Sequence, residues 1–221
     1  MYRICVTNRH LVRKDYIEQL HAVLSGKFGE KPDALILREK DMTEEEYLKL
    51  AQNVMHICED NGVRCIIHNY VHAAKALQAE YLHLSYVKFI ELMSGVSKCS
   101  SGENTNGNHA SDEDANNENA SDECTLDEYI HNENLHIGTS IHSVEDAVQA
   151  EKLGAAYVTA GHIYTTDCKK GLEPRGTCFL AEVCENVSIP VYAIGGINEC
   201  NAKECIKAGA AGVCIMSGYM R

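Results

Sequence analysis

Residues 190–196 read Pro-Val-Tyr-Ala-Ile-Gly-Gly, and residues 212–218 read Gly-Val-Cys-Ile-Met-Ser-Gly. Each stretch is a short apolar run that ends at glycine, a pattern typical of a buried strand followed by a tight loop. A helix-like stretch, 198–208, separates the two runs. Since parallel strands need a crossover connection of about this length, the arrangement predicts two neighbouring strands of a parallel sheet.

Strand-like and helix-like segments alternate along the rest of the chain as well. Six further apolar runs precede this pair, at residues 3–7, 34–40, 64–69, 81–86, 136–141 and 156–161. Thr43 with Glu46, and Ser143 with Asp146, have the spacing of helix capping boxes. Eight such units predict an α/β fold, the closed (β/α)8 or TIM barrel. We expect its last helix to be missing or truncated, because only three residues follow Gly218.

One acidic segment interrupts the alternation. Residues 97–134 are rich in Ser, Asn, Asp, Glu and Gly, and the string Ala-Ser-Asp-Glu occurs twice, at 110–113 and 120–123. Residues 99–133 hold ten acidic and no basic side chains, which is most of the net charge of −12. This composition predicts a disordered insertion in a single barrel domain that spans 1–221. An acidic metal-binding loop is the alternative, although the spacing lacks the EF-hand pattern.

The composition indicates where the protein works. The chain has 221 residues, 45% of them hydrophobic, and no apolar run reaches the roughly 18–20 residues of a membrane span. Its acidity argues against a nucleic-acid partner. Eleven cysteines include no CxxC pair, and Cys5, Cys65 and Cys214 lie inside apolar runs, so we expect reduced thiols. These features predict a cytoplasmic protein with neither a membrane nor a nucleic-acid partner.

The loops after the last two expected strands have the composition of a phosphate site. In TIM barrels, these loops commonly bind phosphate at the C-terminal face of the barrel. Gly195 and Gly196 let backbone N–H groups approach an anion, and Ser217 with Gly218 adds a hydroxyl and another bare backbone position. Two ordinary glycine turns would have the same composition, but their occurrence after consecutive strands favours phosphate binding.

Four segments resemble the thiamine phosphate synthase/TenI family, and they occur in that family's order. They are Leu37–Asp41 (LREKD), Ile137–His142 (IGTSIH), Gly161–Gly176 (GHIYTTDCKKGLEPRG) and Ile189–Ile197 (IPVYAIGGI). The resemblance covers the chain outside the acidic segment and implies a TIM barrel. Within the family, Gly161–Gly176 is most similar to TenI-type proteins.

Departures from the family's pattern separate its two branches. In the synthases, magnesium holds a diphosphate and is itself held by two aspartates, one after the Asn of the third strand and one just after the fourth strand. Here the first position is Tyr70, and residues 85–88 contain no carboxylate. Ile36 and Cys168 replace a glutamine and a threonine of the synthase pattern. The resemblance therefore implies the other branch, the thiazole tautomerases.

A tautomerase of this family shifts a proton on a carboxylated thiazole phosphate, which then becomes aromatic. The match implies that His142 is the catalytic acid/base, since histidine ordinarily titrates near pH 6.5, and that Arg38 binds the substrate carboxylate. We expect no metal and no cofactor. Other residues expected to bind the substrate or its phosphate are Gly195, Gly196, Ser217, Gly218, Thr166, Lys169, Lys40 and His162.

Two alternative functions stay open. One is a divergent thiamine phosphate synthase, which joins a pyrimidine diphosphate to a thiazole phosphate, and the other is a non-catalytic regulator that binds a phosphate ligand. His162 is a second acid/base candidate, while His68, His72 and His83 are interpreted as structural. A homodimer is also expected, because a truncated last helix would leave the outer faces of strands 212–217 and 3–7 uncovered.

Overall fold

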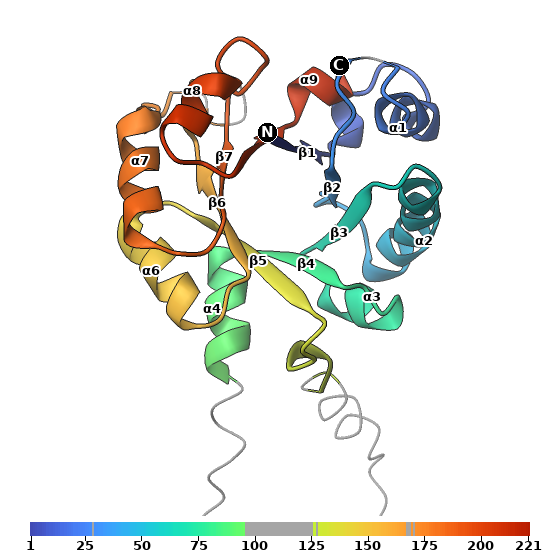
Figure 1. Cartoon of the computed structure of the whole chain (residues 1–221). Helices are drawn as coiled ribbons and strands as arrows, with labels where there is room; N and C mark the ends of the chain where they lie inside the picture. The colour runs from blue at the N-terminus through green and yellow to red at the C-terminus, as the bar shows by residue number, and fades with distance from the viewer. Residues whose placement is uncertain (28, 96–125, 127, 167–168, 170) are drawn as a thin grey trace, which may run out of the picture.

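The computed structural model of the chain describes residues 1–27, 29–95, 126, 128–166, 169 and 171–221. Its strands are all parallel and pair in chain order, and β8 pairs with β1 to close the barrel (Figure 1). The predicted TIM barrel is therefore confirmed. The strands are β1 (Tyr2–Val6), β2 (Ala34–Leu37), β3 (Arg64–His68), β4 (Tyr81–Ser85), β5 (His136–Ile141), β6 (Tyr157–Gly161), β7 (Val191–Ile194) and β8 (Gly212–Ile215).

Helices follow the strands and surround the barrel (Figure 1). After β8 the chain forms the four-residue helix α9. The described helices are η1 (Arg9–Leu11), α1 (Tyr16–Leu24), α2 (Glu44–Asp60), α3 (Val71–Ala76), α4 (Tyr86–Gly95), α6 (Val144–Lys152), α7 (Gly176–Asn186), α8 (Ala202–Lys207) and α9 (Ser217–Met220).

The helix termini follow local side-chain chemistry. The structure contains both expected capping boxes, Thr43 with Glu46 before α2 and Ser143 with Asp146 before α6. Helix α8 begins at Ala202, four residues later than expected. The Asn198 side chain accepts a hydrogen bond from the Cys200 N–H at 2.9 Å, and this turn competes with helix formation.

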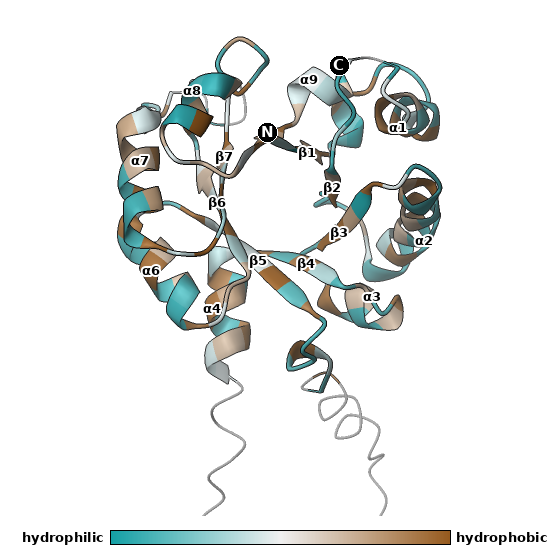
Figure 2. Cartoon of the chain, viewed as in Figure 1, coloured by the Kyte–Doolittle hydropathy of each residue, from teal (hydrophilic) through white to brown (hydrophobic). Residues whose placement is uncertain are grey.

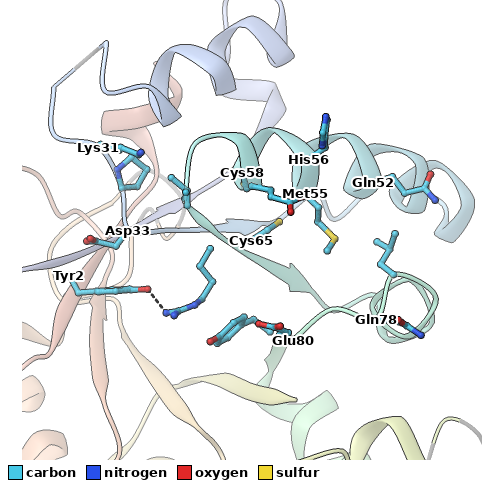
Figure 3. A pocket seen from close by; sticks show the side chains of 17 residues that line it. Tyr2, Lys31, Asp33, Gln52, Met55, His56, Cys58, Cys65, Gln78 and Glu80 are labelled. Atoms are coloured by element: carbon cyan, nitrogen blue, oxygen red, sulfur yellow. Dashed lines mark hydrogen bonds between the residues drawn. The ribbon is translucent and has the colours of Figure 1, made fainter. Parts of the chain in front are cut away.

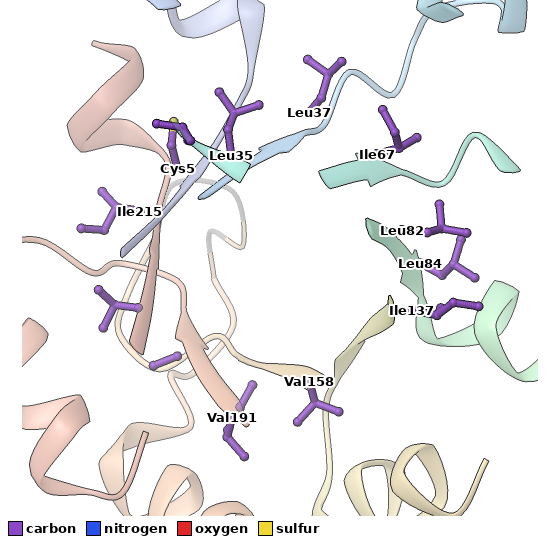
Figure 4. Close-up of a cluster of buried hydrophobic side chains, with 14 of the residues drawn as sticks. Cys5, Leu35, Leu37, Ile67, Leu82, Leu84, Ile137, Val158, Val191 and Ile215 are labelled. Atoms are coloured by element: carbon purple, nitrogen blue, oxygen red, sulfur yellow. The ribbon is translucent and has the colours of Figure 1, made fainter. Parts of the chain in front are cut away.

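Two apolar layers hold the barrel together. The larger layer lies between the strands and the helices and includes Leu35, Leu82, Val158 and Val191 (Figure 4). Alternate side chains of the same strands fill the barrel interior, among them Ile36. Brown strands between helices with teal outer positions show this division in Figure 2. Because burial of one such side chain contributes roughly 1.5–3 kcal/mol, these layers dominate the stability of the fold.

The acidic insertion lies largely outside the described residues, so its predicted disorder stays a prediction. Its described end, however, packs on the barrel. Ile130 is 7% exposed, and the Tyr129 hydroxyl donates to the Ala79 carbonyl at 2.8 Å. The acidic insertion was expected to end at residue 134. It ends earlier in the structure, because Tyr129 and Ile130 already contact the barrel.

The strands expected to be uncovered, and so to favour a homodimer, are covered in the structure. Cys5 of β1 and Val213 of β8 are both fully buried, and Met220 of α9 is buried with them. The Tyr219 hydroxyl donates to the Glu30 carbonyl at 3.0 Å, which ties α9 to the loop after α1. Self-association therefore stays a prediction without this support.

The eight described cysteines are all free thiols. No described helix combines the length and the apolar character that crossing a membrane requires.

Candidate functional site

The ends of β5 and β6 meet at His142. This residue follows β5 directly, its side chain is exposed, and its Nδ1 atom lies 3.3 Å from the Gly161 carbonyl oxygen at the end of β6. A carbonyl oxygen can only accept, so Nδ1 carries the proton in this hydrogen bond. In the neutral ring, Nε2 then holds a free lone pair. The geometry presents a candidate base at the C-terminal face of the barrel.

The glycine loop after β7 packs tightly against the segment after β6. Gly195 has φ +99° and Gly196 has φ +66°, in the left-handed region that favours glycine. A Cβ at Gly195 would lie 2.6 Å from the Cβ of His162, and one at Gly196 would lie 2.4 Å from the Thr165 carbonyl oxygen. Only glycine fits at either position.

His162 is placed differently from the expectation. Its side chain is 7% exposed, and both ring nitrogens are sealed and have no hydrogen-bond partner among the described residues. The Gly161–His162 peptide bond is cis. Because its ring nitrogens are inaccessible in this structure, His162 does not present an acid/base group to the barrel mouth.

A polar network crosses the barrel interior below His142. The Nδ1 atom of His83 lies 3.1 Å from the Tyr157 hydroxyl, and its Nε2 lies 2.9 Å from Ser140 Oγ. Thr159 donates to the same Ser140 oxygen at 3.0 Å. Burial and the positive charge of Arg38 lower the pKa of His83 to about 3. His83 is therefore a neutral structural residue, as expected.

His68 lies beside this network but is not part of it. Its ring stacks on that of His83 with centroids 5.7 Å apart, and its side chain is 6% exposed. Burial, His83 and the positive charges of Arg38 and Lys40 hold the pKa of His68 well below its usual value. Arg38 is half-buried and Lys40 exposed, so strands β2 and β3 bring two cations near a neutral imidazole.

The ends of β3 and β4 are linked through Asn69. Its side-chain oxygen accepts the Ser85 N–H at 2.8 Å, and its carbonyl accepts a hydrogen bond from Lys88 Nζ at 3.2 Å. Tyr70, the next residue, donates to the Met42 carbonyl at 2.6 Å. The resemblance implies a carboxylate at residue 70 and another within residues 85–88 in synthases. Here the first position holds the Tyr70 phenol, and the second region holds the Lys88 ammonium and no carboxylate.

Nearby carboxylates are engaged by the protein itself. Glu39 is 2% exposed and accepts hydrogen bonds from the Thr7 hydroxyl at 2.7 Å and the Tyr16 hydroxyl at 3.0 Å. Three others have partners of their own: Asp41 with Arg9 and His10, Glu44 with the Ala73 N–H, and Asp146 with the N–H groups of His142 and Ser143.

The remaining predicted residues lie on the loops expected for them. Ser217 and Gly218 are exposed after β8, in the turn that becomes α9. Thr166 and Lys169 are half-buried in the loop after β6, where the Thr166 carbonyl accepts the Lys169 N–H at 3.1 Å. The strand order thus brings His142, the Gly195 loop and the Ser217 loop to one face of the barrel.

A cavity of about 1130 Å³ lies elsewhere. It is lined by residues that include Tyr2, Arg64 and Tyr81, at the starts of β1, β3 and β4 (Figure 3). Arg64 donates to the Tyr2 hydroxyl at 2.7 Å across it. Since active sites of TIM barrels lie at the C-terminal ends of the strands, this cavity is not part of the candidate site.

Sequence patterns did not identify the interior residues Ser140 and Thr159. In β6 a signal was present, because Tyr157 and Thr159 lie two residues apart, the spacing of inward-facing positions of a strand. In β5, Thr139 and Ser140 are adjacent, so no alternation marks Ser140.

Comparison with known proteins identifies the family. The sequence pattern of the family described as thiamine monophosphate synthase matches residues 3–89 and 105–219. The chain belongs to this family. It is 27% identical to the thiamine-phosphate synthase of Shouchella clausii over 92% of this chain and 80% of that protein. It is 45% identical to the thiamine-phosphate synthase of Pyrococcus furiosus over 87 residues, which are 39% of this chain and 42% of that protein.

Solved structures agree with this family. The thiamine phosphate pyrophosphorylase from Pyrococcus furiosus has 25% sequence identity and a TM-score of 0.69, over 98% of this chain and 85% of that chain. The N-acetylmannosamine-6-phosphate 2-epimerase of Clostridium perfringens, at 15% identity, has a TM-score of 0.58 and is similar in fold alone. The chain is thus a member of an enzyme family of thiamine biosynthesis.

The magnesium ion implied by the synthase resemblance does not fit the described residues. Mg²⁺ prefers carboxylate and water oxygens, whereas Lys88 contributes a positive charge and Tyr70 has its hydroxyl bonded to Met42. No group of three or more His, Cys, Asp or Glu side chains in the described part of the chain is arranged to hold a metal.

Proposed function

We propose that this protein is a thiazole tautomerase within its family, acting on a carboxylated thiazole phosphate. The observation that carries the proposal is the position of His142, exposed at the end of β5 with Nδ1 on the Gly161 carbonyl oxygen at 3.3 Å. This arrangement leaves Nε2 as a proton acceptor on the face where substrates of TIM barrels bind.

The proposed chemistry is a proton shift within one molecule. His142 takes the proton from the ring carbon that bears the carboxylate, and the electron pair moves through the ring to the exocyclic carbon. That carbon then receives a proton from the protonated imidazole. No atom is gained or lost, and the new aromatic ring supplies the driving force. The protein therefore has to orient the substrate, hold its two anionic groups and move one proton.

The surrounding residues suit these tasks. The backbone N–H groups of Gly195 and Gly196 are proposed to bind the phosphate together with Ser217 and Gly218 on the next loop. Arg38 is proposed to bind the carboxylate, since its charge already acts on the interior histidines His68 and His83. Lys40, Thr166 and Lys169 lie on loops that border this space.

Thiamine-phosphate synthase is the second candidate function. It is favoured by the names of the two relatives, both of which are named synthases. That reaction expels diphosphate, and the developing charge is ordinarily stabilised by a metal ion. Residues 85–88, where the resemblance implies one of the two aspartates, carry the Lys88 ammonium 3.2 Å from the Asn69 carbonyl oxygen, and this positive charge argues against the reaction here.

One assay separates the two functions. The purified protein is expected to aromatise the carboxythiazole phosphate tautomer in excess EDTA, and to form no thiamine phosphate from pyrimidine diphosphate and thiazole phosphate with millimolar Mg²⁺. Mg²⁺-dependent coupling without tautomerisation would establish the synthase. Binding of phosphate ligands with neither activity would indicate the non-catalytic regulator.

A substitution tests the assigned base. We expect His142→Asn to reduce tautomerisation by about 10²–10⁴-fold, the usual contribution of a general acid/base, while phosphate-ligand affinity stays within about twofold. The matched control is His72→Asn, because His72 is also an exposed histidine next to a strand end but lies on α3. Full turnover by the His142 variant would exclude it as the base.

A further inference from the structure

The interior of the barrel contains two histidines whose surroundings differ. Both nitrogens of His83 are satisfied, one by Tyr157 and one by Ser140. The neighbouring His68 has no hydrogen-bond partner for its ring among the described residues, although its backbone N–H binds the Tyr47 hydroxyl at 3.0 Å.

The His68 ring is mostly but not fully buried. Sealed side-chain nitrogens without a partner occur, in the described part of the chain, at His162 alone. His68, in contrast, keeps 6% of its surface exposed. His68 is the last residue of β3, and its side chain faces the barrel interior, as does that of Ile66 two residues earlier. The ring consequently lies inside the barrel, at the level where β3 ends.

The charges around His68 indicate what it binds. Leu37 and Ile67 are register partners of the paired strands β2 and β3, so Arg38 and His68 follow at neighbouring positions of the same end of the barrel. The positive charges of Arg38 and Lys40 also lower the pKa of His68. A second positive charge on the ring would be repelled, so the imidazole is neutral and offers one N–H donor and one acceptor. An anion would be attracted by the cations and would accept the N–H donor that lacks a partner.

We propose that His68 and Arg38 together form the carboxylate-binding end of the site, and that His68 makes the protein selective for a carboxylated substrate. This inference rests on the proposed function for the identity of the ligand. The phosphate loops lie after β7 and β8, and in the closed strand order β3 lies across the barrel from β7. In the proposed binding mode, the carboxylate of the ligand faces β3 and its phosphate faces the loops after β7 and β8.

The experiment compares two ligands and two variants. Isothermal titration calorimetry measures the affinity for carboxythiazole phosphate and for the same thiazole phosphate without its carboxylate. Wild type is expected to bind the carboxylated compound at least tenfold more tightly. His68→Leu should lose this preference while its affinity for the compound without carboxylate changes by less than twofold. His68→Gln keeps an N–H donor and should regain most of the preference.

Thermal unfolding separates this role from a structural one. His68→Leu is expected to melt at or above the temperature of wild type, because leucine removes a polar group that has no partner. The matched control is His83→Leu, which leaves Tyr157 and Ser140 without their shared partner and should melt lower. An unchanged ligand preference in His68→Leu, or a loss of stability equal to that of His83→Leu, overturns the proposal.

The result is also independent of the EDTA assay. If wild type tautomerises the substrate and His68→Leu keeps the ligand preference, the proposed function stands and this inference fails. If wild type shows no tautomerisation but His68→Leu loses the preference, the carboxylate site stands and the proposed function fails.

Discussion

The Asp146 carboxylate accepts a hydrogen bond from the backbone N–H of His142 at 2.9 Å. The same oxygen accepts the Ser143 N–H at 3.1 Å and so completes the capping box that starts α6. One side chain therefore both stabilises a helix terminus and fixes the backbone that carries the candidate base. This connection between local structure and chemistry can be tested directly.

We predict that Asp146→Ala lowers both stability and turnover. Loss of a capping interaction typically costs about 0.5–2 kcal/mol, and the freed backbone at His142 should lower kcat several-fold with little change in KM. Glu46→Ala is the matched control, since Glu46 completes the corresponding capping box of α2, far along the chain from His142. Chemical denaturation and steady-state kinetics measure both effects. Equal kcat values for the two variants would contradict the positioning role of Asp146.

We predict that Gly195→Ala destabilises the protein and weakens phosphate binding. Its φ of +99° opposes alanine, and so does the Cβ of His162, which would lie 2.6 Å from the added methyl group. Gly154→Ala is the control, because Gly154 has φ +87° but no atom within 4 Å of the added methyl group. The control isolates backbone strain, about 1–2 kcal/mol. A loss of stability at Gly195 no larger than at Gly154 would show that the loop can move away from His162.

Acid should destabilise the protein through its interior histidines. The folded-state pKa of His83 is lowered to about 3, and that of His68 is also lowered. The unfolded chain binds protons near pH 6.5 and the folded chain does not, so stability is complete above pH 6.5 and falls as the pH drops below it. His83, whose folded-state pKa is lowered to about 3, should contribute about 1.4 kcal/mol to the difference between pH 7.5 and 5.5, and His68 should contribute in the same direction.

Urea denaturation at the two pH values measures this difference. His68→Leu should reduce it, because leucine does not titrate. His56→Leu is the control, since His56 is an exposed histidine on α2, outside the barrel interior, and the reduction assigned to His68 is the part that exceeds the effect of His56→Leu. An equal slope in wild type and His68→Leu would mean that His68 accepts a proton in the folded state.

The effect of deleting the acidic segment on the melting temperature should depend on where the deletion ends. Replacement of residues 98–125 by a short flexible linker is expected to leave the melting temperature within a few degrees of wild type, given the scarcity of apolar side chains there. Replacement of residues 98–133 should lower it clearly, because Ile130 is buried and Tyr129 bonds to Ala79. Equal melting temperatures for the two deletions would show that these contacts contribute little.

The architecture follows from the amino-acid sequence alone. Apolar runs alternate with amphipathic stretches, which predicts a parallel sheet covered by helices, and eight such units predict a closed barrel. The capping boxes at Thr43 and Ser143 depend on side chains three residues apart, and such local spacing is visible in the sequence. The position of His142 at the end of a strand is visible for the same reason.

Tertiary contacts, in contrast, determine which of the histidines have partners. His68 and His83 look alike in the sequence, since each lies near the end of an apolar run. Their difference depends on Tyr157 and Ser140, which are more than 50 residues away in the sequence. Of the two histidines, His83 is the one whose ring is hydrogen-bonded to them. His162, expected to contact substrate, is sealed against the Gly195 loop for the same kind of reason. Contacts between distant strands are set by the register of the closed barrel, which no local pattern of residues contains.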